Sequence, residues 1–229
     1  RKKGNSKIGN RFETGLLWRE NLPNFPDSYQ IALQRLCTVE RKMARDQDYA
    51  KEYCLKIEDY VSKGYARKLS PEEALIKSNK TFYLPHFGVK TQNKPKLRLV
   101  FDAAAEINSF SLNKALFTGP DLNQPLMTIL FKFREAPIAV CGDIQEMFHQ
   151  ILIRKEDQDS QRFLWRNGDS TMPVGTYVME RMIFGAACSP TAAQYVKNVN
   201  AKNFESRFPR AVKGIIEKHY VDDYVDSFE

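Results

Sequence analysis

The chain has 229 residues, 42% of them hydrophobic and 12% aromatic, which is enough for a folded core of one large or two small domains and excludes a disordered chain. Thirty-five Lys and Arg against 28 Asp and Glu leave a net charge of +7, which suits a polyanionic partner but falls well short of a histone-like tail. The sequence contains no CxxC pair, which excludes a zinc ribbon. It contains no run of roughly 20 apolar residues, which excludes a membrane span, and no apolar signal core after the basic start, which excludes a secretory leader.

The first part of the chain is expected to be an arm followed by helices. Residues 1 to 26 are polar, and the apolar knot of Leu16, Leu17 and Trp18 is predicted to pin an extended arm to the body. A helix is expected after Asp27 and Ser28, which offer an N-cap, because apolar residues then recur at helical spacing as far as residue 43.

Two more helices follow. The second is expected over residues 48 to 62, with Gly64 placed to end it. Its apolar face consists of Tyr49, Tyr53, Ile57 and Tyr60. The segment SPEEAL at 70 to 75 predicts a third, short helix, because Ser70 and Glu73 have the spacing of a capping box.

From residue 82 the periodicity becomes that of strands. TFYLPHFGVK and KLRLVFDA predict a two-stranded basic ribbon with QNKP as its turn, and residues 125 to 135 predict a helix. The continuous apolar run IAVCGDI at 138 to 144 is typical of a central strand covered on both faces. Further strands are expected at 151 to 153, 161 to 166 and 176 to 183, and a helix from 191 to 208.

Acidic residues occur at two places where strands end. Asp143 closes the run at 138 to 144, and a lone carboxylate there is costly unless it is paired or bound to a cation; the simpler interpretation is a capping aspartate. Asp222 and Asp223 are expected at a tight turn between strands at 215 to 221 and from 224 onward. Three carboxylates at one edge of a sheet are the minimum for holding two Mg²⁺ ions of the kind used in phosphoryl transfer.

Four segments, in this order along the chain, resemble motifs of reverse transcriptases. LRLVFD at 97 to 102 resembles the fingers strand, and Asp143-Ile144 followed by Phe148 resembles the first palm motif. FGAACSP at 184 to 190, leading into a helix with Gln194, resembles the motif under the template and nucleotide, and Tyr220-Val221-Asp222-Asp223 resembles the YxDD box. The segments YLPHFGVK, LVFDAAA, SLNKALFTGP and QRFLWR are most similar to those of the Pao/BEL clade of long-terminal-repeat retrotransposons. The resemblance extends from about residue 11 to residue 229.

The resemblance implies a metal site for an RNA-directed DNA polymerase. Asp143 and Asp222 would be the principal ligands of two Mg²⁺ ions, with Mn²⁺ as an alternative ion. Asp223 would lie nearby, and the backbone carbonyl of Ile144 would be a further ligand.

It also implies a nucleotide site. Arg98 would reach the β and γ phosphates with Lys96 beside it, and Phe148 would lie under the sugar, where its ring clashes with a 2′-hydroxyl and so selects deoxynucleotides. Gly185 would allow the backbone to approach the templating base pair. The alternative interpretations are plain core packing for Phe148 and a solvated strand face for Arg98.

Primer and template contacts are implied for Tyr220, Ser189 and Pro190, although a buried tyrosine beside a strand turn is an equal interpretation of Tyr220. Phe184 departs from some retroviral enzymes, which have a glutamine there that touches the nucleotide, so that contact is expected to be missing.

The implied fold is α+β, the fingers and palm of a right-hand polymerase, with an antiparallel palm sheet backed by helices and a mainly helical N-terminal segment. Residues 1 to 80 would be an arm and helical segment packed on the fingers, 81 to 135 the fingers, and 136 to 229 a palm that stops before the thumb. The chain is expected to be an excised piece of a Pol polyprotein, because it begins with Arg1 and ends within a patterned segment.

The implied partners are an RNA or DNA template with its primer, a deoxynucleoside triphosphate, and the remaining Pol segments: thumb, RNase H and integrase. The implied location is intracellular, in cytoplasmic retroelement particles and without membrane attachment. The resemblance does not specify an oligomeric state.

Two other functions are compatible with the residues. An RNA-dependent RNA polymerase shares the palm layout, but such enzymes usually carry Gly before the paired aspartates and a second Asp where this chain has Phe148. A basic module that grips a duplex without turnover is the second alternative, distinguished by salt-dependent binding without metal-dependent incorporation.

Overall fold

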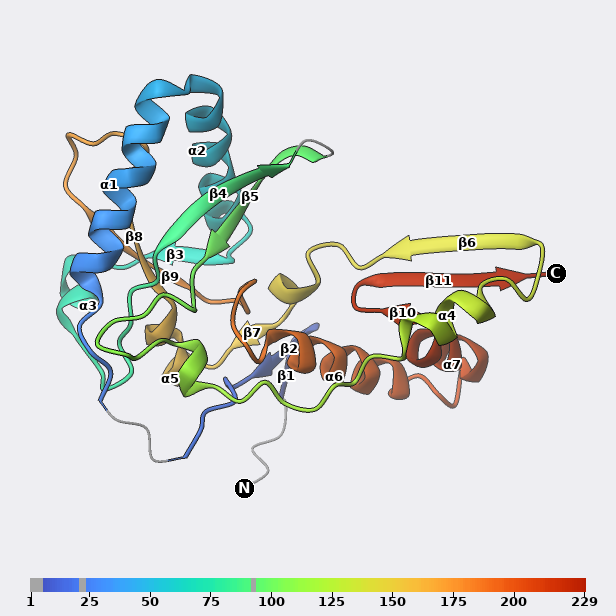
Figure 1. Ribbon diagram of the computed structural model, residues 1–229. Coiled ribbons are helices and arrows are strands. Elements are labelled where there is room, and N and C mark those ends of the chain that lie inside the picture. The colour runs from blue at the N-terminus through green and yellow to red at the C-terminus, as the bar shows by residue number, and fades with distance from the viewer. Residues whose placement is uncertain (1–5, 21–23, 92–93) are drawn as a thin grey trace.

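The structure is a computed structural model that describes residues 6 to 20, 24 to 91 and 94 to 229, without the side chains of 91, 94 and 95. Gln92 and Asn93 of the expected ribbon turn, and residues 1 to 5 and 21 to 23 of the expected arm, lie outside the described residues. Figure 1 shows two parts: the helices α1 and α2 stand over a group of short strands, and a long three-stranded sheet extends away from them.

The N-terminal segment forms a hairpin instead of a simple extended arm. Strands β1 (Ser6–Ile8) and β2 (Arg11–Thr14) pair antiparallel, and β2 pairs in parallel with β7 (Leu152–Ile153). The predicted pinning by the apolar knot is confirmed, because Leu16 is buried. The buried carboxylate of Asp157 accepts hydrogen bonds from Leu16 N (2.9 Å), Trp18 Nε1 (2.7 Å) and Lys80 Nζ (2.9 Å), so it fixes the segment that follows the hairpin.

The three predicted helices are confirmed as α1 (Tyr29–Arg45), α2 (Gln47–Ser62) and α3 (Pro71–Leu75). The predicted face of α2 is buried, and Gly64 follows the helix with a left-handed φ of +64°. The predicted capping box of α3 is present in full. Ser28 does not cap α1 with its side chain; its Oγ accepts a hydrogen bond from Tyr83 N (2.6 Å), which ties α1 to the segment before β4.

Two small sheets complete this part of the molecule. The predicted ribbon is confirmed as β4 (His86–Thr91) paired antiparallel with β5 (Lys94–Phe101). A second sheet has the order β3 (Ala66–Lys68), β9 (Gly175–Met179), β8 (Arg162–Trp165). Between them lies an aromatic core, in which His86 contacts Tyr53 OH through Nδ1 and the Leu164 carbonyl through Nε2 (2.8 Å).

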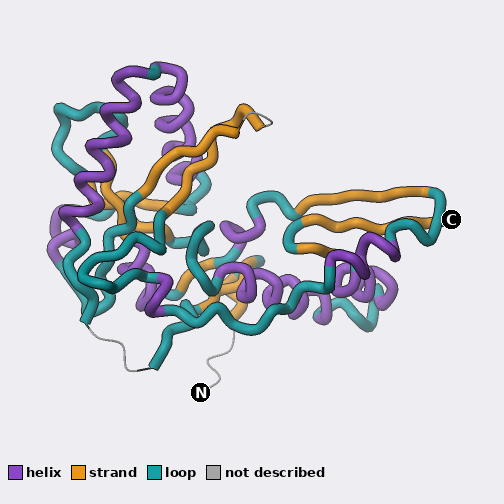
Figure 2. Tube along the Cα trace, in the orientation of Figure 1, coloured by secondary structure: helices purple, strands orange, loops and turns teal. Residues whose placement is uncertain are grey.

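The extended part contains an antiparallel sheet with the order β10 (His219–Tyr220), β11 (Asp223–Phe228), β6 (Ile138–Asp143). Helices α4 (Leu126–Lys132) and α7 (Pro209–Glu217) lie along this sheet, and α6 (Ser189–Lys202) contacts α7 and the turn between β10 and β11 (Figures 1 and 2). Four further short helices are η1 (Asn113–Ala115), η2 (Met147–Gln150), α5 (Lys155–Gln158) and η3 (Asp159–Gln161).

Two sequence predictions about this sheet are wrong. Strand β6 is exposed along its whole length, since among the described strands it pairs with β11 only and lies at the edge of the sheet. The strand expected at 215 to 221 is mostly helix, because Pro209 begins α7 and the helix continues to Glu217, leaving His219–Tyr220 as strand. Helices α4 and α6 also end earlier than predicted, at Lys132 and Lys202.

In the described part of the chain, no helix combines the length and the apolar character needed to cross a bilayer.

The histidines predict how stability depends on pH. All three (His86, His149 and His219) are buried, and burial lowers the pKa of each to about 4. The unfolded chain, with histidine pKa values near 6.5, binds more protons between pH 6.5 and 4, so stability present at pH 7 is lost as the pH falls through this window. Each histidine contributes at most about 1.4 kcal/mol per pH unit.

Urea unfolding at pH 7, 6 and 5 measures this loss. The free energy of unfolding should fall steadily, and the His86→Gln variant should show a shallower slope whatever its absolute stability. A stability that does not change between pH 7 and 5 would contradict neutral buried histidines.

Candidate active site

The turn between β10 and β11 brings Asp222 and Asp223 to the end of β6, where Asp143 lies. Asp223 is the direct cross-strand partner of Asp143, and Ile144 N donates a hydrogen bond to the carbonyl of Asp222 (2.9 Å). Because opposite residues alternate between hydrogen-bonded and non-hydrogen-bonded pairs, Asp143 and Asp223 form the non-hydrogen-bonded kind, with a typical Cα separation of about 4.5 Å. Their side chains therefore leave the same face of the sheet.

This arrangement is electrostatically unfavourable by itself. Like charges directly opposite each other on antiparallel strands repel. Over the described ranges, the side chains of Asp143, Asp222 and Asp223 make neither a hydrogen bond nor an ion pair that would relieve the repulsion. Asp143 and Asp223 are exposed and Asp222 is half-buried, so water and dissolved ions reach them.

The donor atoms fit a hard cation. Carboxylate oxygens are the ligands that Mg²⁺ prefers, and Mg²⁺ commonly takes only one or two from the protein and fills its shell with water and phosphate oxygens. No cluster of three or more His, Cys, Asp and Glu capable of holding a metal ion occurs among the described residues, so a closed protein cage is not preformed. The carbonyl oxygen of Ile144 accepts a hydrogen bond from Met147 N (3.2 Å) and has a second lone pair free for another contact.

The hairpin tip is held by α6. Val221 takes a left-handed φ of +57°, which is rare for a β-branched residue and is maintained only when the surroundings impose it. Gln194, buried on α6, donates from Nε2 to the Val221 carbonyl (2.8 Å). Sequence reasoning placed Gln194 in a motif but gave it no role; the signal was an amide side chain on an otherwise apolar helix face.

Phe148 lies in η2, immediately after the loop that leaves β6. It is 8% exposed, and its ring packs edge-on against Phe184 with 4.5 Å between centroids. Phe184 is 41% exposed, so it forms the outer surface of this pair.

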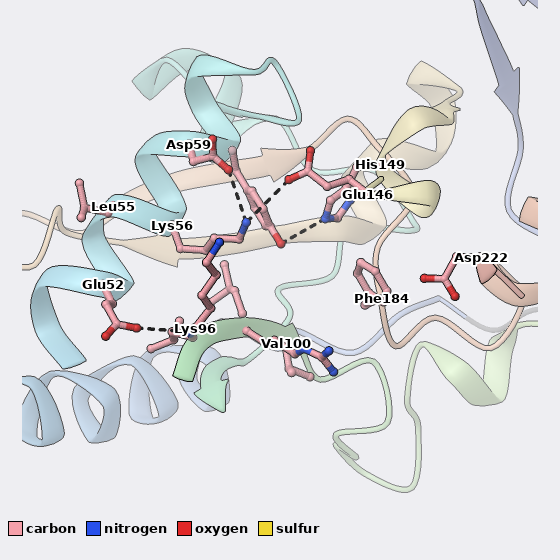
Figure 3. A pocket seen from close by; sticks show the side chains of 14 residues that line it. Glu52, Leu55, Lys56, Asp59, Lys96, Val100, Glu146, His149, Phe184 and Asp222 are labelled. Carbon is pink, nitrogen blue, oxygen red and sulfur yellow. Dashed lines mark hydrogen bonds and ion pairs between the residues drawn. The ribbon is translucent and has the colours of Figure 1, made fainter. Parts of the chain in front are cut away.

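A cavity of about 820 Å³ lies between α2, β5 and the 146–149 turn. Of the predicted nucleotide-binding residues, Lys96 and Arg98 of β5 line it, and Asp222 lines it from the hairpin (Figure 3). Asp143 and Asp223 are not among its lining residues. The cavity thus places two cations of β5 and one carboxylate of the hairpin around a single space.

Gly185 has a local structural explanation. Its φ is +106°, and a Cβ atom there would lie 2.6 Å from the carbonyl oxygen of Phe101 in β5. Its own carbonyl accepts from Asn113 Nδ2 (2.9 Å). Glycine is therefore required for packing against β5, whatever a template would demand.

The predicted primer and template residues divide into two groups. Ser189 is buried and its Oγ donates to the Ile183 carbonyl (2.7 Å), so its hydroxyl already has a partner inside the protein. Pro190, at the start of α6, is exposed, and Tyr220 is 39% exposed. Of these three residues, Pro190 and Tyr220 therefore present surface to a ligand and Ser189 does not.

The chain is α+β, and its antiparallel sheet carries acidic residues at the β10–β11 hairpin and at the end of β6. No protein-family model matches the chain, and no curated protein matches it. Its fold is similar to that of a foamy viral protease–reverse transcriptase solved in complex with double-stranded DNA, with a TM-score of 0.53 and 20% sequence identity. The match covers 76% of this chain and 25% of that protein, so the chain spans about a quarter of its length, and the likeness is one of fold alone.

The glycine geometry gives a paired prediction. Gly185→Ala should lower the free energy of unfolding by roughly 2 kcal/mol or more, because the new methyl group meets backbone and the φ value is strained. Gly142→Ala, in β6, should change it by less than about 0.5 kcal/mol, because nothing lies closer than 3.9 Å to the added Cβ and its φ lies outside the left-handed region. Urea unfolding measures both variants, and equal effects would contradict the close approach of Gly185 to Phe101.

Proposed function

We propose that the chain is the fingers and palm of an RNA-directed DNA polymerase, a reverse transcriptase of the Pao/BEL clade of retrotransposons. One observation carries the proposal: Asp143 and Asp223 oppose each other, no cation among the described residues pairs with them, and the cavity beside the hairpin is lined by Arg98 and Lys96. The similarity of fold to a reverse transcriptase supports it. Residues 81 to 135 would be the fingers and 136 to 229 the palm.

In this proposal Asp143 and Asp222 hold two Mg²⁺ ions, with Mn²⁺ as an alternative, while Asp223 and the Ile144 carbonyl lie within reach. When bound, the ions would lower the pKa of the primer 3′-hydroxyl and neutralise charge at the α-phosphate. The chain itself fixes the carboxylates: Gln194 and Ile144 N hold the two consecutive carbonyls of Val221 and Asp222. Positioning of this kind supplies much of the rate in phosphoryl transfer.

Arg98 and Lys96 would bind the polyphosphate of the incoming deoxynucleotide. Both side chains are exposed on β5 and face the cavity that Asp222 also lines. The planar guanidinium of Arg98 can form two parallel hydrogen bonds to phosphate oxygens, whereas Lys96 acts as a point charge.

Phe148 would select the sugar from beneath, with Phe184 between it and solvent. Tyr220 and Pro190 would contact the primer–template duplex from the surface, while Ser189 would act indirectly by fixing the start of α6. The partners would be an RNA or DNA template with its primer and a deoxynucleoside triphosphate.

Primer extension on an RNA template with deoxynucleotides and Mg²⁺ or Mn²⁺ tests the proposal. Asp143→Asn and Asp222→Asn should each reduce incorporation at least about 100-fold, because a lost metal contact is worth several kcal/mol in the transition state. Asp48→Asn, an exposed acid in the first turn of α2, is the matched control and should leave the rate unchanged.

Incorporation that persists in Asp143→Asn would contradict the proposal. Tight, salt-sensitive duplex binding by the unmutated chain without any incorporation would instead favour a binding module that does not turn over.

A further inference from the structure

The loop between Asp143 and Phe148 is attached to α2, an element that the sequence motifs leave without a role. Glu146, in the middle of this loop, has a left-handed φ of +52° and therefore sends the chain sharply from β6 into η2. A non-glycine residue keeps this conformation only when surrounding contacts impose it.

Those contacts come from the end of α2 and the residues just after it. The Glu146 carboxylate accepts hydrogen bonds from Lys63 Nζ (2.9 and 3.2 Å) and from Tyr65 OH (2.8 Å). Lys56 Nζ, about two helical turns before Lys63, lies 3.8 Å from the same carboxylate, and Figure 3 shows it between Asp59 and Glu146. The Glu146 side chain is 20% exposed, so these interactions are partly shielded from solvent.

The charges are consistent with a fixed ion pair. Hydrogen bonds to Glu146 and then Asp59 raise the pKa of Lys63, so this ammonium group stays charged around neutral pH.

The same loop is held on its other side and at its end. Arg11 of β2 donates to Gln150 Oε1 (2.8 Å), and Gln150 Nε2 donates to the Gln145 carbonyl (3.1 Å). His149, next to Phe148, contacts Tyr60 OH of α2 through Nε2 (3.1 Å). The loop and η2, which follows it, are therefore connected to α2 and its C-terminal end at two points, through Glu146 and through His149.

We propose that Glu146 is a positioning residue that links α2 to the loop 143–148, so that α2 sets where the Phe148 ring stands relative to Asp143. This link between α2 and the loop gives α2 and Lys63 a part in discriminating deoxynucleotides from ribonucleotides, an assignment that rests on the proposed polymerase function. Glu146 itself takes no part in the chemistry; it acts through the loop conformation.

Hydrogen exchange of the amides of residues 144–150 tests the link without any activity. Glu146→Gln keeps the shape but loses the charge, and Lys63→Met removes the cation while keeping its apolar stem. Both should speed exchange in this segment by roughly threefold or more, because fewer contacts resist local opening. Lys63→Arg should restore slow exchange.

Asp59→Asn is the matched control. The substitution removes the other carboxylate that binds Lys63 (3.0 Å). Among the described residues Asp59 makes no hydrogen bond or ion pair with the loop, so exchange at 144–150 should not change. Unchanged exchange in both Glu146→Gln and Lys63→Met would overturn the proposal, and so would acceleration by Asp59→Asn equal to theirs.

Single-nucleotide incorporation then tests the consequence. In Glu146→Gln and Lys63→Met, the KM for the deoxynucleotide should rise several-fold with a smaller change in kcat, and the preference over the ribonucleotide should fall, whereas Lys63→Arg should behave as wild type. Faster loop exchange with unchanged sugar preference would overturn the assigned part in discrimination. A wild-type chain that incorporates neither nucleotide would overturn the proposed function and, with it, the part of α2 and Lys63 in sugar discrimination. If exchange at 144–150 still responded to substitution of Glu146 and Lys63, that result would support only the structural link between α2 and the loop.

Discussion

The repulsion between Asp143 and Asp223 is the constraint around which the extended part of the molecule is organised. The carboxylates of Asp143 and Asp223 face each other across β6 and β11, and the turn before β11 supplies a third carboxylate, that of Asp222. Such a pair lowers stability unless a cation lies between the side chains, so the backbone around it must be fixed by other interactions. Three interactions fix this backbone: the pairing of β11 with β6 along both strands, the hydrogen bond from Gln194 to Val221, and the hydrogen bond from Ile144 to Asp222.

The rest of the structure brings basic groups and a shaped cavity to the same place. Packing of the ribbon on α2 holds Lys96 and Arg98 of β5 at the cavity. Glu52 of α2 binds both Lys90 (2.8 Å) and the backbone N–H of Leu97 (3.2 Å). The close contact of Gly185 with Phe101 joins the other end of β5 to the segment before α6. The N-terminal segment is part of this assembly too, since α2 forms one wall of the cavity and Arg11 of β2 donates a hydrogen bond to Gln150 of η2. Residues of α2, the ribbon and the hairpin therefore line one cavity although they are distant in sequence.

Local patterns in the sequence predicted the elements that depend on local interactions. The tyrosine spacing of α2, the capping box at Ser70 and the alternation of β4 and β5 were sufficient, because periodicity and caps act within a few residues. The acidic motifs also predicted the meeting of Asp143 with the hairpin. The exposure of β6 could not be predicted, because an apolar run does not reveal whether a neighbouring element covers the strand. Residues 215 to 217 fit either period, and the helix that starts at Pro209 decided the outcome. Gln194, Glu146 and Asp157 act through partners far away in sequence, which no local pattern reveals.

Asp143 and the Asp222–Asp223 hairpin are proposed to form a divalent cation site, and binding of Mn²⁺ followed by electron paramagnetic resonance tests this most directly. The wild-type chain should bind Mn²⁺ at a site from which Mg²⁺ displaces it, and Asp143→Asn or Asp222→Asn should weaken that binding at least about 10-fold, with Asp48→Asn unchanged. Binding that is equally strong in all four proteins, or absent from the wild type, would contradict the account.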